Sequence, residues 1–421
     1  MLSPATITHL GDHRRRGDLP FAPMSPPRPL DLGPELPGAP LGLYLHIPFC
    51  AHICPYCDFN TYAGQEDQIP RYVAALEREI DLAGRSLAGR PAATIFFGGG
   101  TPSLLTPDQI SRLIRACRHT FDLDPTAEIT MEANPNGLDA GRLAGYREAG
   151  VNRLSIGVQT LDKRGLRRLG RLHEAADSAE AVAAARAAGF DNLSLDLIFG
   201  WPGQTLDVWC RDLDLVLAGD LGGSPPEHLS LYNLIVEPGT PLADAVTRGI
   251  VVVPDDDAGA DLYELAIDRL ADAGYCHYEV ANWARDDARM SRHNLIYWRN
   301  GDYLGFGAGA HGHLAGQRTM NHLLPTTYCA SLEGDADPIS NRETISPLLA
   351  RGETMMLGLR LLRGGVDETA FAIRHGETID AAYGKIVAEV SALGLLNRKD
   401  GKLSLTARGL MLANDVCARF L

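Results

Sequence analysis

The amino-acid sequence predicts an α/β fold in which a parallel barrel, open or closed, precedes a smaller C-terminal domain. From residue 41 onward, short apolar runs alternate with stretches that have the periodicity of amphipathic helices. Parallel strands are buried on both faces and therefore read as apolar runs, and each parallel crossover needs a helix. The 421 residues suffice for one large barrel or for two to three domains.

Strands and helices are expected in alternation. The expected strands are 41–47, 94–97, 128–132, 153–158, 192–198 and 228–233. The expected helices are 71–87, 107–121, 139–148, 175–188, 205–218 and, after the last strand, 255–273. Ligands of parallel α/β folds bind at the carboxyl ends of the strands, so the residues that follow each strand are the candidates for a functional site.

Four regions are expected along the chain. Residues 1–40 carry three consecutive arginines and then a proline-rich run, which predicts a disordered leader. Residues 41–275 are expected to form the core and 276–346 a connecting or lid region whose pattern is irregular and glycine-rich as far as residue 322. An accessory domain is expected over 347–421.

The accessory domain is expected to be helical and similar in shape to a winged helix. Helices are predicted at 348–362 and 379–393, and the pair Asp400-Gly401 between two short runs predicts a hairpin, followed by a last helix. Basic residues are sparse there, which opposes DNA binding. We expect this domain to dock on the barrel or to receive a partner.

Composition narrows the class of ligand and the compartment. The 53 acidic and 39 basic residues give a net charge of −14, which opposes binding to nucleic acid or to anionic lipid. No segment reads as a membrane span or as a secretory signal. Only three of the eight cysteines are clustered, which is not the pattern of a disulfide scaffold. We therefore expect a cytoplasmic protein that binds small molecules.

The three clustered cysteines follow the first expected strand. Cys50, Cys54 and Cys57 have the spacing C-x3-C-x2-C, which eight randomly placed cysteines would produce with a probability of roughly 0.003. A zinc site would need a fourth ligand, for which His46 or His52 is available. Three thiolates also suit a cubane iron–sulfur cluster with one iron left open for an exchangeable ligand.

This spacing at the end of a first barrel strand resembles the radical S-adenosylmethionine (SAM) superfamily. The resemblance implies a partial (β/α)6 barrel, a [4Fe-4S] cluster on the three cysteines, and SAM bound at the open iron and cleaved to methionine and a 5′-deoxyadenosyl radical. The segment Gly98-Gly99-Gly100-Thr101-Pro102 after the second strand is similar to the segment that meets the SAM amino group, although a glycine triplet alone also fits a simple tight turn.

Polar residues after the later strands extend the resemblance. Glu132 ends the third strand and would be a costly buried charge without a polar partner. From residue 41 to about 233 the chain resembles the branch that contains the oxygen-independent coproporphyrinogen III oxidases and the HemW-type heme chaperones. Positions that contact SAM in that branch match Tyr44, Tyr56, Gly99, Gly100, Thr101, Glu132, Gln159, Arg171 and Asp196. For any one of them, a hydrogen bond between two loops is the structural alternative.

Two features separate the chaperones from the oxidases. The oxidases carry a further cysteine two residues after the cluster motif, where this chain has Phe59. Residues 293–298 read HNLIYW and match the H-N-x-x-Y-W signature of the HemW type. The resemblance favours His293 as an axial heme ligand, because neutral imidazole binds heme iron, with Tyr297 and Trp298 covering a porphyrin face. Spacing alone would favour a structural anchor.

Other histidines and other functions stay open. His311 is a rival heme ligand in a loop that also borders the SAM site, and His313 and His322 are weaker candidates. The resemblance implies a heme chaperone that binds heme and passes it to an acceptor protein, for which a respiratory or membrane-bound acceptor fits. The alternatives are an oxygen-independent coproporphyrinogen III oxidase and a radical SAM enzyme of another substrate, such as a methyltransferase.

Overall fold

The computed structural model describes residues 39–421, so the predicted leader lies outside the described residues except for its last two positions. Seven parallel strands stand side by side in the order β11-β1-β4-β5-β6-β7-β8, within a twelve-stranded sheet. Their bounds are β1 Leu41–Ile47, β4 Pro91–Gly99, β5 Asp122–Ala133, β6 Arg153–Gln159, β7 Leu193–Phe199, β8 His228–Asn233 and β11 Tyr303–Phe306.

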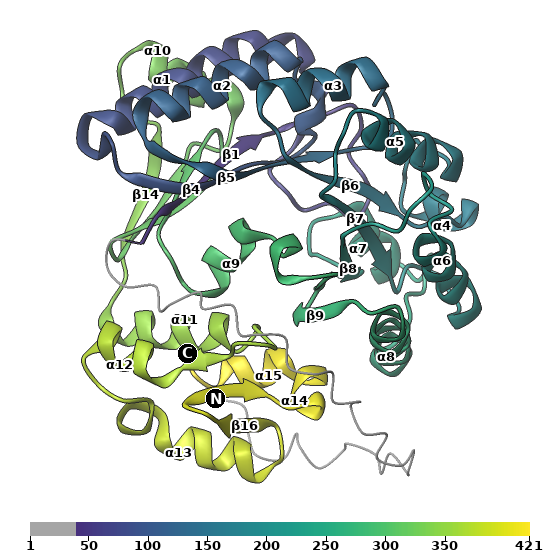
Figure 1. Cartoon of the computed structure of the whole chain (residues 1–421), viewed down its shortest axis with the longest axis vertical. Helices are drawn as coiled ribbons and strands as arrows, with labels where there is room; N and C mark the ends of the chain where they lie inside the picture. Colours follow the sequence, from purple (N-terminus) through teal and green to yellow (C-terminus); the bar gives the residue numbers. More distant parts are fainter. Residues whose placement is uncertain (1–38) are drawn as a thin grey trace. The chain divides into compact units, whose positions relative to one another are not determined.

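Helices connect the parallel strands and cover the outer face of the sheet (Figure 1). The connecting helices are α1 Ile69–Leu87, α2 Pro107–Thr120, α3 Ala140–Ala149, α4 Lys163–Arg168, α5 Ala175–Ala187 and α6 Leu206–Ala218, whereas α7 Pro241–Thr247 and α8 Asp256–Asp272 follow β8 and precede the antiparallel strand pair that ends the sheet. The predicted α/β barrel is therefore confirmed. Among residues 39–421, none of the helices has both the length and the hydropathy needed to cross a membrane.

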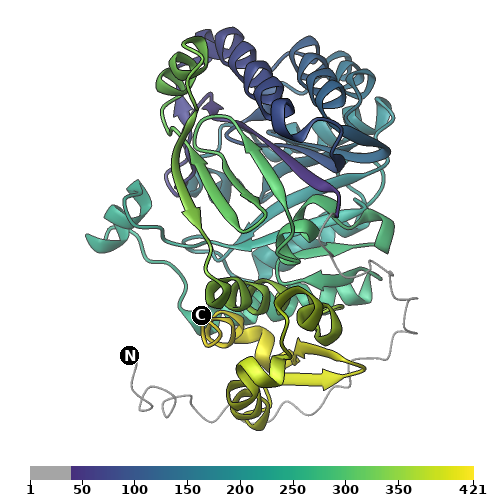
Figure 2. The ribbon, with the colours of Figure 1, turned by 90° about the vertical axis from the view of Figure 1, so that its left-hand side faces the viewer.

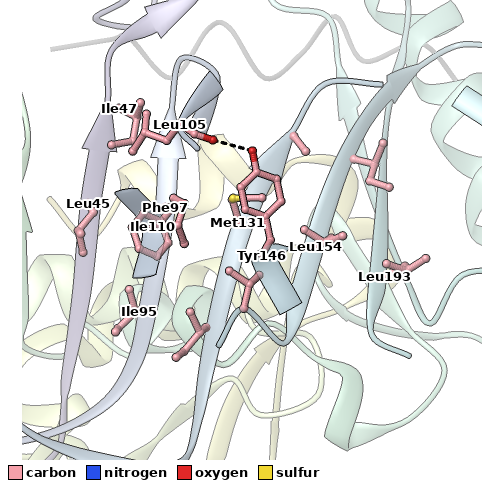
Figure 3. Packing of buried hydrophobic residues seen from close by; sticks show 14 of the residues in the cluster. Leu45, Ile47, Ile95, Phe97, Leu105, Ile110, Met131, Tyr146, Leu154 and Leu193 are labelled. Atoms are coloured by element: carbon pink, nitrogen blue, oxygen red, sulfur yellow. Dashed lines mark hydrogen bonds between the residues drawn. The ribbon is translucent and has the colours of Figure 1, made fainter. Parts of the chain in front are cut away.

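The two faces of the barrel strands differ in polarity. Along β1, the alternate residues Leu41, Leu43, Leu45 and Ile47 point outward and are fully buried under the helices. Figure 3 shows part of this core, with Leu45, Ile95, Phe97, Met131 and Leu154 from four adjacent strands and Ile110 and Tyr146 from the covering helices. The intervening residues of the same strands face inward, and many of them are polar.

Residues 276–344 are not irregular, which corrects the prediction for this region. They form β9 Cys276–Glu279, β10 Asn282–Ala284, α9 Arg292–Trp298, β12 His311–Leu314, β13 Gln317–Asn321, α10 Pro325–Glu333 and β14 Ile339–Thr344, besides β11. The strands extend both edges of the sheet, mostly by antiparallel pairing, and Figure 2 shows the edge formed by β12 to β14. Their sequences are short and carry no clear alternation. They form strands because backbone pairing with a neighbouring strand stabilises them.

The C-terminal region has a hydrophobic core of its own, which includes Met355, Phe371, Val387, Leu403 and Phe420. Its elements are α11 Pro347–Gly358, β15 Val366–Asp367, α12 Glu368–His375, α13 Ile379–Ala392, β16 Leu396–Lys399, β17 Lys402–Leu405, α14 Ala407–Met411 and α15 Ala413–Ala418. The hairpin predicted at Asp400-Gly401 joins β16 to β17. Both of its residues have positive φ, as this turn requires.

Candidate functional site

The inner face of the barrel gathers polar side chains at the carboxyl ends of the strands. Tyr44 and His46 of β1, Glu132 of β5 and Asp196 of β7 occupy the positions that alternate with the buried outward-facing residues. The Tyr44 hydroxyl lies 3.0 Å from His46 Nδ1, and His46 Nε2 donates to the Asn60 carbonyl at 2.9 Å. Burial lowers the pKa of His46, so its imidazole is neutral at pH 7.

The cysteine loop begins directly after β1. Cys50 ends β2 (Phe49–Cys50), which pairs in parallel with β3 (Tyr62–Ala63), so the loop is closed at its base. The Cys57 amide donates to the Cys54 carbonyl at 3.1 Å, which forms a turn between these two cysteines. All three thiols are free and half-buried. Burial raises the pKa of the Cys50 and Cys57 thiols.

Two of the cysteine sulfurs accept hydrogen bonds from residues at other strand ends. The Thr101 hydroxyl donates to Cys50 Sγ at 3.5 Å, and Arg171 Nη1 donates to Cys54 Sγ at 3.5 Å. Among residues 39–421, no three His, Cys, Asp or Glu side chains form a group that could hold a single metal ion. In a cubane cluster each cysteine binds a different iron, so the three thiols need not converge on one point as the ligands of a single ion must. Hydrogen-bond donors to the cysteine sulfurs also fit that cofactor.

The glycine segment packs against the cysteine loop. The Gly100 and Thr101 amides donate to the Ile47 and Phe49 carbonyls at 2.9 and 2.8 Å, so they connect β4 to the loop. A Cβ at Gly100 would lie 2.7 Å from the Phe49 carbonyl oxygen. The glycines therefore permit close approach of two backbones. Of this segment, only the Gly99 amide points to a candidate SAM residue, donating to Glu132 Oε2 at 3.1 Å.

Glu132 and Asp196 form an acidic pair inside the barrel. Burial raises the pKa of Glu132 to about 7, and the neighbouring Asp196 charge adds to this rise. Burial also raises the pKa of Asp196, against the opposing effect of hydrogen bonds from serine hydroxyls. Ser155 Oγ lies 2.9 Å from both carboxylate oxygens of Asp196. A ligand that donates hydrogen bonds or carries positive charge would be stabilised between these carboxyl groups.

The remaining SAM candidates lie around the same end of the barrel. Gln159 ends β6 with a φ of +66°. Its side-chain Nε2 would lie 2.6 Å from a Cβ placed on Gly157, so the Gln159 side chain turns back over the strand. Tyr56 packs against a small cluster that contains Leu169 and Trp201. The structure thus brings Tyr56, Gln159 and Arg171 to the rim that holds the cysteine loop.

Asn134 belongs to this site, although no pattern in the sequence identified it. Its Nδ2 donates to Thr101 Oγ1 at 3.0 Å, and its Oδ1 accepts a hydrogen bond from Arg171 Nη2. The available signal was its spacing, since Asn134 lies two residues after Glu132 and two residues along a strand return to the same face. Ser155, which donates a hydrogen bond to Asp196, was not predicted either.

His293 lies at the start of α9, on the inner side of the sheet. It is 1% exposed, and its ring stacks on Phe96 with centroids 5.0 Å apart. Its Nδ1 is 2.7 Å from the Thr94 hydroxyl, and its Nε2 is 2.7 Å from the Tyr297 hydroxyl. Burial lowers the pKa of His293 to about 3, so the imidazole is neutral. Both ring nitrogens are therefore engaged within the protein.

The other histidines and Trp298 occupy different positions. His311 begins β12 with an exposed side chain, and partial burial lowers its pKa. His313 is buried with Nδ1 3.0 Å from the Gly301 carbonyl, and His322 is half-buried between β13 and α10. Trp298 packs against a cluster that includes Tyr278, Met290 and Leu361, and the Arg360 guanidinium lies over its ring, 5.8 Å from the centroid.

Comparison with known proteins agrees with this geometry. Residues 44–216 match the Radical SAM superfamily, and residues 346–412 match the HemN C-terminal domain. Among solved structures, the radical SAM coproporphyrinogen III oxidase HemN of Escherichia coli has a TM-score of 0.78 at 25% identity, covering 92% of this chain and 91% of that chain. The predicted fold class is confirmed by this similarity.

Curated relatives are similar over nearly the whole described chain. The heme chaperone HemW of Bacillus subtilis is 38% identical over 383 residues, which cover 90% of this chain and 98% of the relative. The heme chaperone HemW of Mycobacterium tuberculosis is 38% identical over 384 residues, which cover 90% of this chain and 95% of the relative. A barrel with three free cysteines at its rim, the HNLIYW helix on its inner side and these relatives together show that the chain belongs to the HemW heme chaperone family of the radical SAM superfamily.

Proposed function

We propose that this protein binds heme and transfers it to an acceptor protein. The observation that carries the proposal is the 38% identity to HemW heme chaperones over 90% of the chain. The acidic net charge of −14 agrees with a protein or small-molecule partner and not with nucleic acid. We place the protein in the cytoplasm, since all eight cysteines are free.

Cys50, Cys54 and Cys57 are the residues we assign to a [4Fe-4S] cluster. When bound, the cluster supplies an electron and an open iron to which SAM coordinates. We assign the nearby inner-face and rim residues to SAM, with Glu132 and Asp196 accepting hydrogen bonds from it. The same assignment covers Tyr44, Tyr56, Gly99, Gly100, Thr101, Gln159 and Arg171.

For heme we propose His293 as the axial ligand through Nε2. A ligating histidine normally has its second ring nitrogen held by a hydrogen-bonding partner, and the Thr94 hydroxyl at Nδ1 is such a partner. The neutral imidazole is the form that binds iron, and the low pKa of His293, about 3, keeps it neutral. Ligation requires the Tyr297 hydroxyl to leave Nε2.

His311 is the competing ligand in this proposal. Its side chain is exposed, so ligation there needs no internal hydrogen bond to break. The two assignments place the heme differently, since His293 lies on α9 inside the barrel and His311 lies on β12 at the extended edge of the sheet.

A coproporphyrinogen III oxidase activity is the second candidate, favoured by the similarity to HemN over 92% of the chain. Phe59 stands against it, because the oxidases place a cysteine there and a phenyl ring cannot take the role of a thiol. The Phe59 side chain is 67% exposed, so it faces solvent beside the cysteine loop.

The test is a parallel assay of one anaerobically reconstituted preparation. Heme is titrated into the protein while the Soret band is recorded, and the heme-loaded protein is then mixed with apomyoglobin as a defined acceptor. Porphyrinogen decarboxylation is measured with SAM and a reductant. We expect stoichiometric heme binding, transfer to apomyoglobin and no decarboxylation. Absence of saturable heme binding would refute the proposal, and steady decarboxylation would support the oxidase.

A further inference from the structure

A continuous chain of hydrogen bonds joins two of the three cysteines through residues in loops that follow different strands. From Cys54, it runs through Arg171 to Asn134 at the end of β5, then to Thr101 after β4, and from there to Cys50. Arg171 also donates to the Gly157 carbonyl at 3.3 Å, which fixes the guanidinium to β6. Three strand ends thereby determine the surroundings of two cysteine sulfurs.

The direction of each hydrogen bond follows from the chemistry of the groups. Arginine has only donors, so the side-chain oxygen of Asn134 faces Arg171 and its NH2 group faces Thr101. The Thr101 oxygen accepts from this NH2 group at 3.0 Å, and its single hydroxyl hydrogen is then directed to Cys50 Sγ. An amide at position 134 satisfies both neighbours, whereas a carboxylate would attract the hydroxyl hydrogen away from the sulfur.

We propose that Asn134 is a positioning residue for the iron–sulfur cluster, which orients Thr101 and Arg171 so that both donate hydrogen bonds to cluster sulfurs. The proposal rests on the cluster and is independent of heme transfer, so each can fail without the other. Donors to cysteine sulfur stabilise the reduced cluster, which carries one more negative charge, and so raise its reduction potential. Asn134 thereby makes the cluster easier to reduce.

The test is a redox titration of the reconstituted cluster, followed by electron paramagnetic resonance, in variants of the full chain. At the wild-type midpoint potential, we expect the reduced-to-oxidised ratio to fall by roughly threefold or more in Asn134→Ala and in Asn134→Asp. Thr101→Val removes the donor to Cys50 and the acceptor for the Asn134 NH2 group, but it leaves the hydrogen bonds from Arg171 to Asn134 and to Cys54, so its ratio is expected to fall less. Thr101→Ser keeps the hydroxyl and is expected to retain the wild-type midpoint.

Asn136→Asp is the matched control, because Asn136 is exposed in the same loop and the charge change is the same. Its midpoint is expected to stay near that of the wild type. Iron and sulfide content are measured for every variant, which separates a lower potential from a lost cluster. Wild-type midpoints in Asn134→Ala and Asn134→Asp at full iron content would overturn the proposal. If both variants fail to retain iron, an unchanged midpoint in Thr101→Val would overturn it.

Discussion

The hydrogen bond between Tyr297 and His293 makes Tyr297→Phe the most informative variant for the heme ligand. The two side chains are one helical turn apart on α9, and the Tyr297 hydroxyl lies 2.7 Å from His293 Nε2. Ligation of iron through Nε2 must break this bond. Replacing tyrosine by phenylalanine keeps the ring and removes only the hydroxyl, so the variant binds heme without that cost.

The expected size of the effect follows from the net value of a buried hydrogen bond. Between neutral side chains this is about 1 kcal/mol, which corresponds to about a fivefold change in Kd. We therefore expect Tyr297→Phe to bind heme about fivefold more tightly than the wild type. Thr94→Val removes the partner that holds Nδ1, and we expect it to bind heme more weakly, because the imidazole is no longer oriented.

The assay is a heme titration monitored at the Soret band for the wild type, Tyr297→Phe, His293→Ala and His311→Ala. If His293 is the ligand, His293→Ala loses the ligand-dependent spectrum and His311→Ala retains it. A Kd for Tyr297→Phe equal to or weaker than that of the wild type contradicts the reasoning. An unchanged spectrum in His293→Ala together with a lost one in His311→Ala would transfer the ligand to β12.

Three further predictions concern pH and stability. Burial raises the pKa of Glu132 to about 7, above its value in an unfolded chain. Between about pH 4.5 and 7 the native apoprotein therefore holds a proton that the unfolded chain has lost. The contribution of Glu132 to the free energy of unfolding consequently falls as pH rises through that window. In urea denaturation at pH 8 we expect Glu132→Gln to be more stable than the wild type, by on the order of 1–3 kcal/mol, and in calorimetry to bind SAM more weakly; a loss of stability would contradict the assignment. Gly99 has a φ of +112°, and a Cβ there would lie 2.4 Å from the His46 ring. Gly99→Ala should therefore lower the free energy of unfolding by more than about 2 kcal/mol and reduce iron incorporation. The control Gly137→Ala, with a φ of +76° and open space around the added Cβ, should lower it by about 1 kcal/mol. Tyr146→Phe removes the hydroxyl that donates to the Leu105 carbonyl at 2.7 Å, the bond drawn in Figure 3, and should lower the free energy of unfolding by about 1–2 kcal/mol; equal stabilities would show that water replaces this bond.

Much of the barrel was predictable because its strands follow a local pattern. The runs that became β1, β6 and β8 were assigned within one residue of their observed bounds. β11 was not predicted, since its four residues, Tyr303–Phe306, include a glycine and carry no periodic signal. It is a strand because β1 offers an unpaired edge, and that edge is known only once the sheet exists.

The site was predictable by residue type but not by contact. Residues at the carboxyl ends of strands were expected to converge, and Glu132, Asp196 and Arg171 lie at that end of the barrel. The sequence does not reveal which way the Gly100 and Thr101 amides point. In the structure they donate to the Ile47 and Phe49 carbonyls beside the cysteine loop. The pairing of His293 with Thr94 spans 199 positions, so no local spacing reveals it.

The position of β11 beside β1 has a consequence for when the cysteine loop is completed during synthesis. Asn60 Nδ2 donates to the Ala308 and Leu323 carbonyls at 3.0 Å each, and the Tyr62 hydroxyl donates to Leu323 as well. These anchors leave the ribosome more than two hundred residues after the cysteines do. A nascent chain that ends before them carries all three thiols without these anchors, so we expect cluster loading to follow translation through this point.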